Sequence, residues 1–475
     1  MRDLLCAMRS TNLATIGLFL GIFLRHPPSS AQPAAKGPAL SAYSIGIARA
    51  LPRTVTATLL FSKDLPKEFA SEEMATRALL RQYQEVNRTR FKISEVDPAS
   101  APSGFKSGAC AIAPVHFRES LDERRNEALY LGLCLQDGAR SLLVPDVFAR
   151  PGLEFEISRW LTKVAKALPT VGFTVGHGEL DSGQRLAKMK QFFDGEFDVV
   201  GLDPSAVPIG EKISALVVAG PNQPFNKVGV DAVAGYLDGG KSAIFLLPTM
   251  RVNGPAPAKS LDDRITFDLS PVPATGLEPL LARYGFRVEP GITMVESSNA
   301  ANGRITLADS RDILQLLPHY LRLGGVKQDH PALEDVSTIV LSSASQVTAI
   351  PEPKGGATQA ATVARVTELL TAPTSSWIRG KPFTIDPGNK GSFEAKPARK
   401  ARALAFAYEG KTRLLVLGTA TFLDDEFFKL GRFDPGYMSG MWIMGNALRW
   451  MTEEPALSAL RPRAPAPEAK PSEGN

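Results

Sequence analysis

The fold is decided by residues 170–202, which read TVGFTVGHGELDSGQRLAKMKQFFDGEFDVVGL. The apolar run at 170–175 is typical of a buried strand, and 182–193 has apolar residues at helical spacing before a second strand run at 197–202. A strand, a helix and a strand of these lengths form a βαβ unit with parallel strands. The same alternation continues to residue 247. The sequence therefore predicts a doubly wound α/β domain.

The tetrad Gly176-His177-Gly178-Glu179 lies where the first of these strands meets the helix. Open α/β sheets bind ligands at this edge. A histidine donor, a glutamate acceptor and two glycines that leave the backbone accessible suit a small site for a ligand or partner. The alternative is a tight turn, with the next polar residue capping the helix. We favour the turn, and the four residues remain the first candidate site.

A second candidate, Asp424 and Asp425, follows the strand run at 413–417. Together with Glu426 they place three carboxylates in a row. Such a row either binds a cation or occupies the first turn of a helix, where negative charge is favourable. We favour helix capping, and both aspartates are kept as candidate binding residues.

Motifs for catalysis are absent from the sequence. There is no P-loop, no Gly-x-Ser-x-Gly elbow, no His-Glu-x-x-His, and no histidine pair at metal-ligand spacing. We therefore predict no enzyme, no catalytic residue, no metal and no cofactor. The 54 basic and 49 acidic side chains nearly balance, without the basic patch that phosphate backbones require, so nucleic acid is not an expected partner.

A smaller α/β domain is predicted at residues 41–168. Its elements are strand runs at 54–61 and 91–96 around a helix from 71 to 86, strand runs at 128–135 and 141–144, and a closing helix at 155–168. This order suggests an open sheet of thioredoxin-like order, without the Cys-x-x-Cys of the redox enzymes.

The larger domain is predicted at residues 169–455, with insertions. It contains a helical piece at 310–321 and a final amphipathic helix at 437–451. Residues 456–475, rich in Pro and Ala, are expected to form a disordered tail.

The N-terminus has the pattern of an export signal. Two arginines precede an uncharged apolar run at 13–24, and small residues stand at Ser29 and Ala31. We predict a signal peptide at 1–31 with cleavage after Ala31, or an uncleaved anchor, and a linker at 32–40. The protein is then exported, either periplasmic or anchored to the inner membrane facing the periplasm.

Two cysteines, Cys110 and Cys134, remain in the mature chain if the signal is removed. An even pair in an oxidising compartment allows a disulfide. Because the sequence does not show whether their Cβ atoms converge, a bridge and two buried thiols both remain open.

The order of the segments resembles the GldG-like proteins, auxiliary components of gliding-motility and related ABC transport systems. The resemblance runs from about residue 41 to residue 462. Its motifs include Phe61-Ser62-Lys63-Asp64-Leu65-Pro66, Tyr130-Leu131-Gly132-Leu133, Gly176-His177-Gly178-Glu179, Tyr236-Leu237-Asp238-Gly239-Gly240 and the region from Gly418 to Phe428.

That resemblance implies an extracytoplasmic body beside an ABC permease and its ATPase. It also implies that the larger domain is similar to GIFT and glutamine-amidotransferase-like sheets, here without the amidotransferase nucleophile. Family members continue into a C-terminal membrane helix, whereas this sequence ends in the Pro-rich tail, which weakens the expectation of stable anchoring.

The function predicted is a non-catalytic, substrate-binding-like auxiliary subunit of an ABC-type transport system. Two alternatives remain: a hydrolase-like enzyme that uses His177 and Glu179, and a periplasmic scaffold unrelated to transport.

Overall fold

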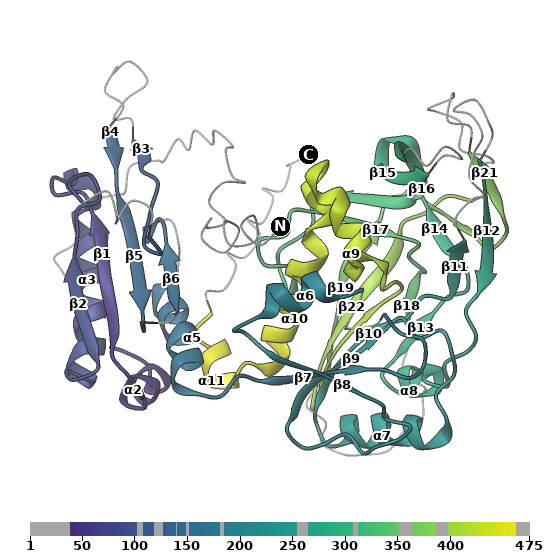
Figure 1. Ribbon diagram of the computed structural model, residues 1–475, viewed down its shortest axis with the longest axis horizontal. Helices are drawn as coiled ribbons and strands as arrows, with labels where there is room; N and C mark the ends of the chain where they lie inside the picture. The colour runs from purple at the N-terminus through teal and green to yellow at the C-terminus, as the bar shows by residue number, and fades with distance from the viewer. Residues whose placement is uncertain are drawn as a thin grey trace, which may run out of the picture. The chain divides into compact units, whose positions relative to one another are not determined.

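The computed structural model describes residues 39–101, 108–117, 127–138, 140–148, 152–180, 185–253, 265–306, 312–350, 364–385 and 398–461. Within them the chain is a mixed α/β protein, which confirms the predicted class. It forms two compact units (Figure 1). The first unit comprises the described parts of Met1–Ala167 and Glu454–Asn475, and the second those of Leu168–Glu453. The predicted signal segment (1–31) lies outside the described residues.

A four-stranded sheet forms the centre of the first unit. In spatial order its strands are β2 (Phe91–Glu95), β1 (Val55–Phe61), β5 (Leu131–Gln136) and β6 (Ser141–Val144). β1 and β2 are parallel and are connected by α3 (Ala70–Val86), whereas β5 is antiparallel to both of its neighbours. The unit also contains α2 (Ala42–Arg49), α5 (Leu153–Ala165) and α11 (Pro455–Ser458). The disorder predicted from residue 456 onward is wrong for residues 456–458, which are helical and include the buried Leu457.

The single strand predicted at 128–135 is wrong, because the chain forms two strands there. β4 (Glu127–Leu129) pairs with β3 (Val115–Phe117), whereas β5 pairs with β1. Between them, the N–H of Tyr130 donates to Ser62 Oγ at 2.9 Å and its carbonyl accepts from the Ser62 N–H at 3.0 Å. The backbone bond continues the β1–β5 pairing by one residue, whereas the Ser62 side chain takes the place of the second backbone bond, so β5 and β4 are separate strands.

Cys110 and Cys134 form a disulfide, with their Cα atoms 5.6 Å apart. Cys134 lies on β5, and both cysteines are buried against Leu60 of β1. Of the two states that the sequence left open, the structure has the bridged one. The bond ties the segment before β3 to the centre of the sheet.

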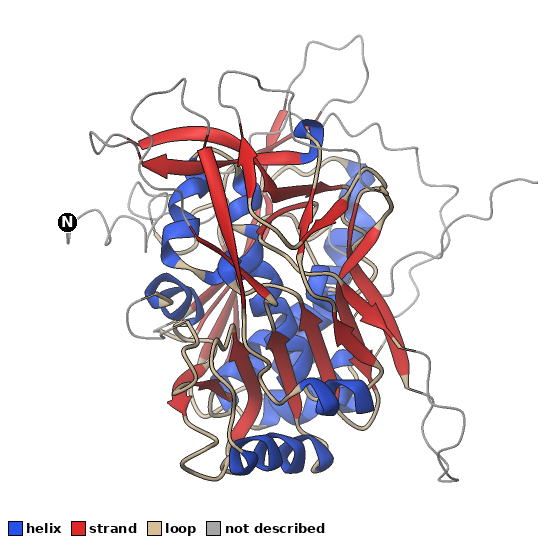
Figure 2. Cartoon of the chain, turned by 90° about the vertical axis from the view of Figure 1, so that its right-hand side faces the viewer, coloured by secondary structure: helices blue, strands red, loops and turns tan. Residues whose placement is uncertain are grey.

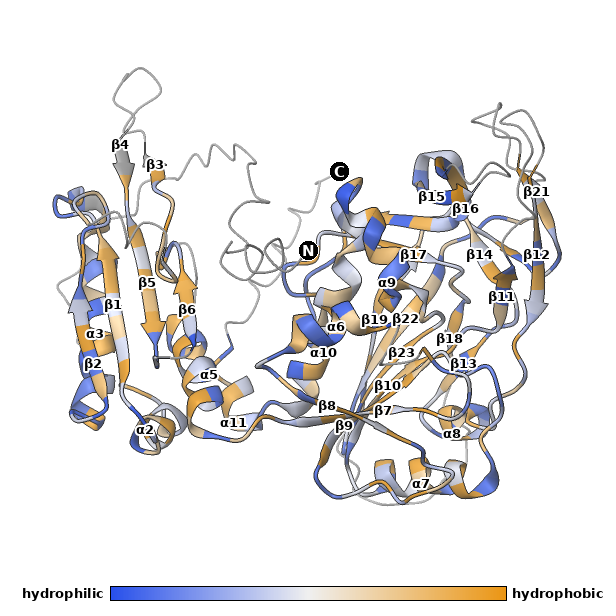
Figure 3. Cartoon of the chain, viewed as in Figure 1, coloured by the Kyte–Doolittle hydropathy of each residue, from blue (hydrophilic) through white to orange (hydrophobic). Residues whose placement is uncertain are grey.

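A seven-stranded sheet forms the centre of the second unit. In spatial order its strands are β19 (Arg365–Ala372), β22 (Arg402–Glu409), β23 (Arg413–Leu417), β10 (Ser242–Leu246), β9 (Ile213–Ala219), β7 (Thr170–Thr174) and β8 (Asp198–Leu202). The five strands from β23 to β8 are parallel, and β22 is antiparallel to both of its neighbours. Figure 3 shows that these strands are largely hydrophobic, as expected when both faces of a sheet are covered.

Helices cover both faces of this sheet, which is the doubly wound arrangement. α6 (Ala187–Phe193) and α10 (Ser439–Thr452) share one apolar cluster with Val217 of β9. α7 (Lys227–Asp238) and α8 (Glu278–Arg283) share another with Val218, the next residue of the same strand. Successive side chains of a strand point to opposite faces, so each face has its own core.

Smaller sheets, seen among the red arrows of Figure 2, are formed mainly by the segment between β10 and β19. Their strands are β11 (Met250–Asn253), β12 (Ile265–Pro271), β13 (Phe286–Val288), β14 (Ile292–Met294), β15 (Ala300–Thr306), β16 (Asp312–Gly324), β17 (Thr338–Ser342), β18 (Val347–Ala349), β20 (Trp377–Arg379) and β21 (Phe383–Ile385).

The helix predicted at 310–321 is wrong, because Asp312–Gly324 is the long strand β16. It lies between β15 and β17 and pairs with both. Pro318, in the middle of the segment, lacks the N–H that a helix interior needs. Pairing with strands on both sides therefore outweighs the local helical spacing.

Two other predicted helices are present with shifted bounds. The helix predicted at 437–451 is α10. The helix predicted at 182–193 is α6, which begins at Ala187, and residues 181–184 lie outside the described part. None of the helices in the described ranges has the length and hydropathy that a membrane-spanning helix requires.

Candidate functional site

The tetrad lies at the point where the connections of the large sheet change direction. β7 continues through α6 to β8 on one side, whereas β9 continues through α7 to β10 on the other. In open α/β sheets the crevice between two such strands, at their carboxyl ends, is where ligands bind. The tetrad directly follows β7 and residues 220–226 directly follow β9, so both loops border this switch point.

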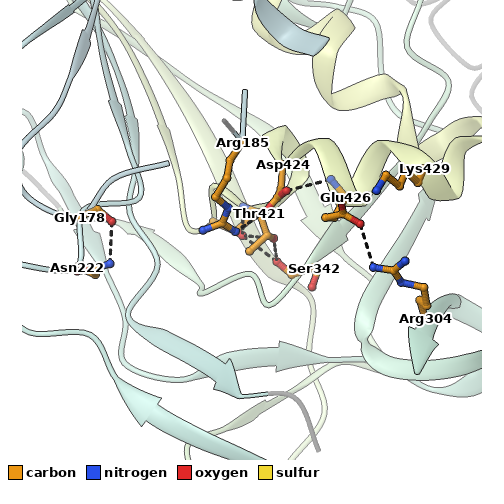
Figure 4. A network of polar contacts seen from close by, with 10 residues as sticks. Gly178, Arg185, Asn222, Arg304, Ser342, Thr421, Asp424, Glu426 and Lys429 are labelled. Carbon is orange, nitrogen blue, oxygen red and sulfur yellow. Dashed lines mark hydrogen bonds and ion pairs between the residues drawn. The ribbon is translucent and has the colours of Figure 1, made fainter. Parts of the chain in front are cut away.

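Hydrogen bonds join these two loops. The carbonyl of His177 accepts from the backbone N–H groups of Asn222 and Gln223, at 2.9 and 3.0 Å. The side-chain amide of Asn222 donates to the carbonyl of Gly178 at 2.7 Å (Figure 4). Gly178 has a φ of 71°, and a Cβ there would lie 2.1 Å from Asn222 Oδ1. The left-handed backbone therefore favours glycine, and a larger residue would have to displace the Asn222 side chain from this contact.

The imidazole of His177 is enclosed by residues of the second unit. Its ring is stacked on Phe225, with 3.7 Å between centroids and 14° between planes, and the residue is 5% exposed. Nε2 lies 2.8 Å from Ser205 Oγ, and Nδ1 lies 3.3 Å from Glu179 Oε1. The other oxygen of Glu179 accepts from the His177 N–H at 2.7 Å. Glu179 thus uses its carboxylate within the turn, whereas the ring of His177 joins the turn to Ser205 in the loop after β8. These contacts agree with the interpretation of the tetrad as a structural turn.

Ser205 is the residue that sequence reasoning missed. It follows β8, and no motif or spacing in the sequence links it to His177. The chain of contacts Ser205–His177–Glu179 has the order of nucleophile, base and orienting acid found in serine hydrolases. However, a Cβ on Gly229 would lie 2.4 Å from Ser205 Oγ, so the hydroxyl is packed against the first turn of α7.

Asp424 and Asp425 have separate partners in the structure. Asp424 caps α9 (Asp425–Phe428), since its Oδ1 accepts from the Glu426 N–H at 3.0 Å, and its Oδ2 accepts from Arg185 Nε at 3.0 Å. Asp425 Oδ1 accepts from the N–H of Lys188 in α6, also at 3.0 Å. Figure 4 shows the Arg185–Asp424 contact apart from the Gly178–Asn222 contact.

These contacts do not bring the two aspartates and the tetrad into one ligand set. Asp424 acts as a helix cap and ion-pair partner, and Asp425 fastens α6 to α9. Among the described residues, no group of three or more His, Cys, Asp or Glu side chains could hold a metal ion.

Comparison with known proteins identifies the family. A family model for auxiliary proteins, described as "ABC-type uncharacterized transport system", matches residues 168–431, which is more than half of the chain and nearly all of the second unit. The chain belongs to this family. A second model, for a domain of unknown function, matches residues 39–136 in the first unit.

Other comparisons give only distant likeness. No curated protein matches the chain. Among solved structures, the "mmIFT52 N-terminal domain" aligns with 60% of this chain and 98% of its own length, at 14% sequence identity and a TM-score of 0.38.

Proposed function

We propose that this member of the family is a non-catalytic, extracytoplasmic auxiliary subunit that works by binding beside an ABC permease and its ATPase. The observation that carries the proposal is the family match over nearly the whole second unit. In this role the chain would bind the transported substrate, as substrate-binding subunits do, or transfer it to the permease.

The extracytoplasmic location is supported by two features. One is the export pattern at residues 1–31 of the sequence. The other is the buried Cys110–Cys134 disulfide, since such bonds persist in oxidising compartments and are rare in the cytosol. In protein taken from its native compartment, Cys110 and Cys134 should therefore resist maleimide alkylation until the chain is unfolded and reduced, and a Cys6→Ser variant removes the third cysteine in case the N-terminal segment is retained.

Action by binding rather than catalysis is supported by the contacts of the tetrad. His177 is enclosed by Phe225, Ser205 and Glu179, and the Ser205 hydroxyl is packed against α7. The hydrolase alternative rests on the contact between Ser205 and His177, and a covalent probe tests it below.

Within the family we propose the GldG-like branch, on the ordered motifs of the sequence. For the first unit we propose a thioredoxin-like relationship, because its sheet has two parallel strands followed by an antiparallel hairpin. For the second unit we propose a GIFT and amidotransferase-like relationship, with the sheet retained and the nucleophile absent.

The direct test is co-purification in the native organism. We expect an affinity-tagged full-length chain to retain an ABC permease and ATPase encoded beside its gene, and the mature N-terminus to be Gln32 if the signal is cleaved. Retention of neither subunit in mild detergent, with no such genes nearby, would favour the unrelated scaffold. A chain starting at Met1 in the membrane fraction would instead indicate an uncleaved anchor.

A further inference from the structure

A surface cavity of about 350 Å³ lies in the second unit, away from the switch-point residues. One wall comes from the hairpin of β15 and β16, and the other from α9 and the 3-10 turn η6 (Lys429–Arg432) that follows it. The lining residues are Arg304, Asp312, Ile313, Leu314, Glu426, Lys429, Leu430, Arg432 and Phe433. This volume is at the lower end of the range for ligand pockets.

Both carboxylates of the cavity are already neutralised. Arg304 lies 3.3 Å from Asp312 and 2.9 Å from Glu426, and it thereby joins the two walls. Lys429 lies 2.5 Å from Glu426. The hydrogen bond from Lys429, assisted by Arg304, holds the pKa of Glu426 below its ordinary value. Ion pairs therefore connect the two walls of the cavity, and both of its carboxylates, Asp312 and Glu426, are paired with cations.

Arg432 is a cationic residue of the cavity that forms no ion pair within the described part of the chain. It is exposed, and its guanidinium lies over the ring of Phe433, 4.5 Å from the centroid. That ring is 51% exposed and, with Leu314 at 40%, is among the few large apolar side chains that the described surface exposes. A free cation and two exposed apolar groups thus line one cavity.

We propose that this cavity binds a protein partner through a short segment in which a carboxylate stands beside an aliphatic side chain. The carboxylate pairs with Arg432, and the aliphatic group packs against Phe433 and Leu314. This inference rests on the proposed function, because an auxiliary subunit of a transporter has protein partners. It adds the chemistry of the segment through which such a partner binds.

The composition of the lining favours a protein segment over a small molecule. Small-molecule pockets are lined mainly by apolar side chains and bury most of their ligand. Here five of the nine lining residues are charged, and the apolar anchors are only about half covered. Arginine is instead one of the residue types enriched among the few that dominate binding between proteins, and at this cavity Arg432 lies beside the exposed ring of Phe433.

The test is selection of peptides by the purified full-length chain. A phage library of random dodecapeptides would be panned against it, and the enriched peptides synthesised and titrated by fluorescence anisotropy. We expect enriched peptides to carry Asp or Glu within three residues of Leu, Ile or Val. We expect Phe433→Ser to weaken their binding at least about tenfold, as for a central anchor. Arg432→Glu should weaken it similarly and prefer the peptide whose carboxylate is replaced by lysine.

Matched variants separate this effect from general damage. Val207→Ser removes another exposed apolar side chain, and Arg88→Glu reverses another exposed arginine. Both should bind the peptides as the parent does. Absence of enrichment, or peptides that bind Phe433→Ser and Arg432→Glu unchanged, would overturn the proposal. The peptide assay contains no transporter, so its failure counts against the peptide site alone. A failed co-purification would instead count against the transport role.

Discussion

The side-chain amide of Asn222 donates to the carbonyl of Gly178 at 2.7 Å and so fastens the loop after β9 to the loop after β7. This contact occupies the switch point, where a doubly wound sheet usually receives its ligand. In this chain the two loops bind each other. A side chain at Gly178 should therefore weaken the contact between the two loops.

Substitution of Gly178 by alanine should destabilise the second unit by more than its backbone conformation alone requires. A left-handed non-glycine residue costs about 1–2 kcal/mol, and the added Cβ would also lie 2.1 Å from Asn222 Oδ1. Gly138→Ala is the matched control, since Gly138 has a φ of 91° and no atom within 4 Å of its Cβ position. Urea unfolding should show the larger loss for Gly178→Ala, partly relieved by adding Asn222→Gly. Equal losses for the two glycine variants would contradict this.

Ser205 should not react as a catalytic serine. Its hydroxyl contacts His177 Nε2 but is packed against the first turn of α7. A fluorophosphonate probe, which labels activated serines, should therefore leave the native chain unlabelled. Ser205→Ala should cost about 1–3 kcal/mol, because it leaves Nε2 of the buried His177 without its hydroxyl partner. Labelling that is lost in both Ser205→Ala and His177→Ala would instead support the hydrolase alternative.

Replacing Asp424 should lower the stability of the second unit, whereas adding calcium to the protein should leave its stability unchanged. It caps α9 and pairs with Arg185, so Asp424→Ala should cost about 0.5–2 kcal/mol. Asp231→Ala is the control, because it breaks only an exposed pair with Lys227, and such pairs contribute about 0–1 kcal/mol. Thermal unfolding with and without millimolar CaCl₂ measures both effects. A rise in Tm with calcium that Asp424→Ala abolishes would restore the cation-site interpretation.

The parts of the fold that the sequence predicts are those with a local signal. The strands and helix of 170–202 follow from periodicity within one βαβ unit, and the capping by Asp424 follows from its place before a helix. The strand β16 does not, because its partners are β15 and β17 and the local spacing suits a helix equally well. Pro318 was the one local indication against that helix.

The sequence predicts where the candidate site lies in the sheet, but not which residues contact the tetrad. The tetrad lies at the sheet edge that the strand–helix order indicates. Its partners Ser205 and Asn222 come from the loops after two other strands, so only the tertiary structure brings them to His177 and Gly178. The Cys110–Cys134 bridge is similar, because the convergence of two Cβ atoms depends on the position of a loop on the sheet.

His319 should make the stability of the second unit depend on pH. It lies on β16 with its ring edge-on to Phe267 and Phe383, at 5.1 and 5.2 Å between centroids. Its Nδ1 is buried and has no hydrogen-bond partner within the described chain. Burial in these surroundings disfavours the charged imidazolium and lowers the pKa of His319 to about 3.

Because this pKa is lower in the folded chain than in the unfolded one, the unfolded state binds the proton first as the pH falls. The contribution of neutral His319 is therefore complete above about pH 6.5 and is lost as the pH falls from there toward 3, at up to about 1.4 kcal/mol per pH unit. His319→Phe removes the titrating group while keeping a ring, so urea unfolding between pH 4 and pH 7 should show a flatter profile than the parent. Phe383→Leu disturbs the same cluster without a titrating group, and it should lower stability equally across this range. Parallel profiles for the parent and His319→Phe would mean that His319 is not the origin of the acid sensitivity.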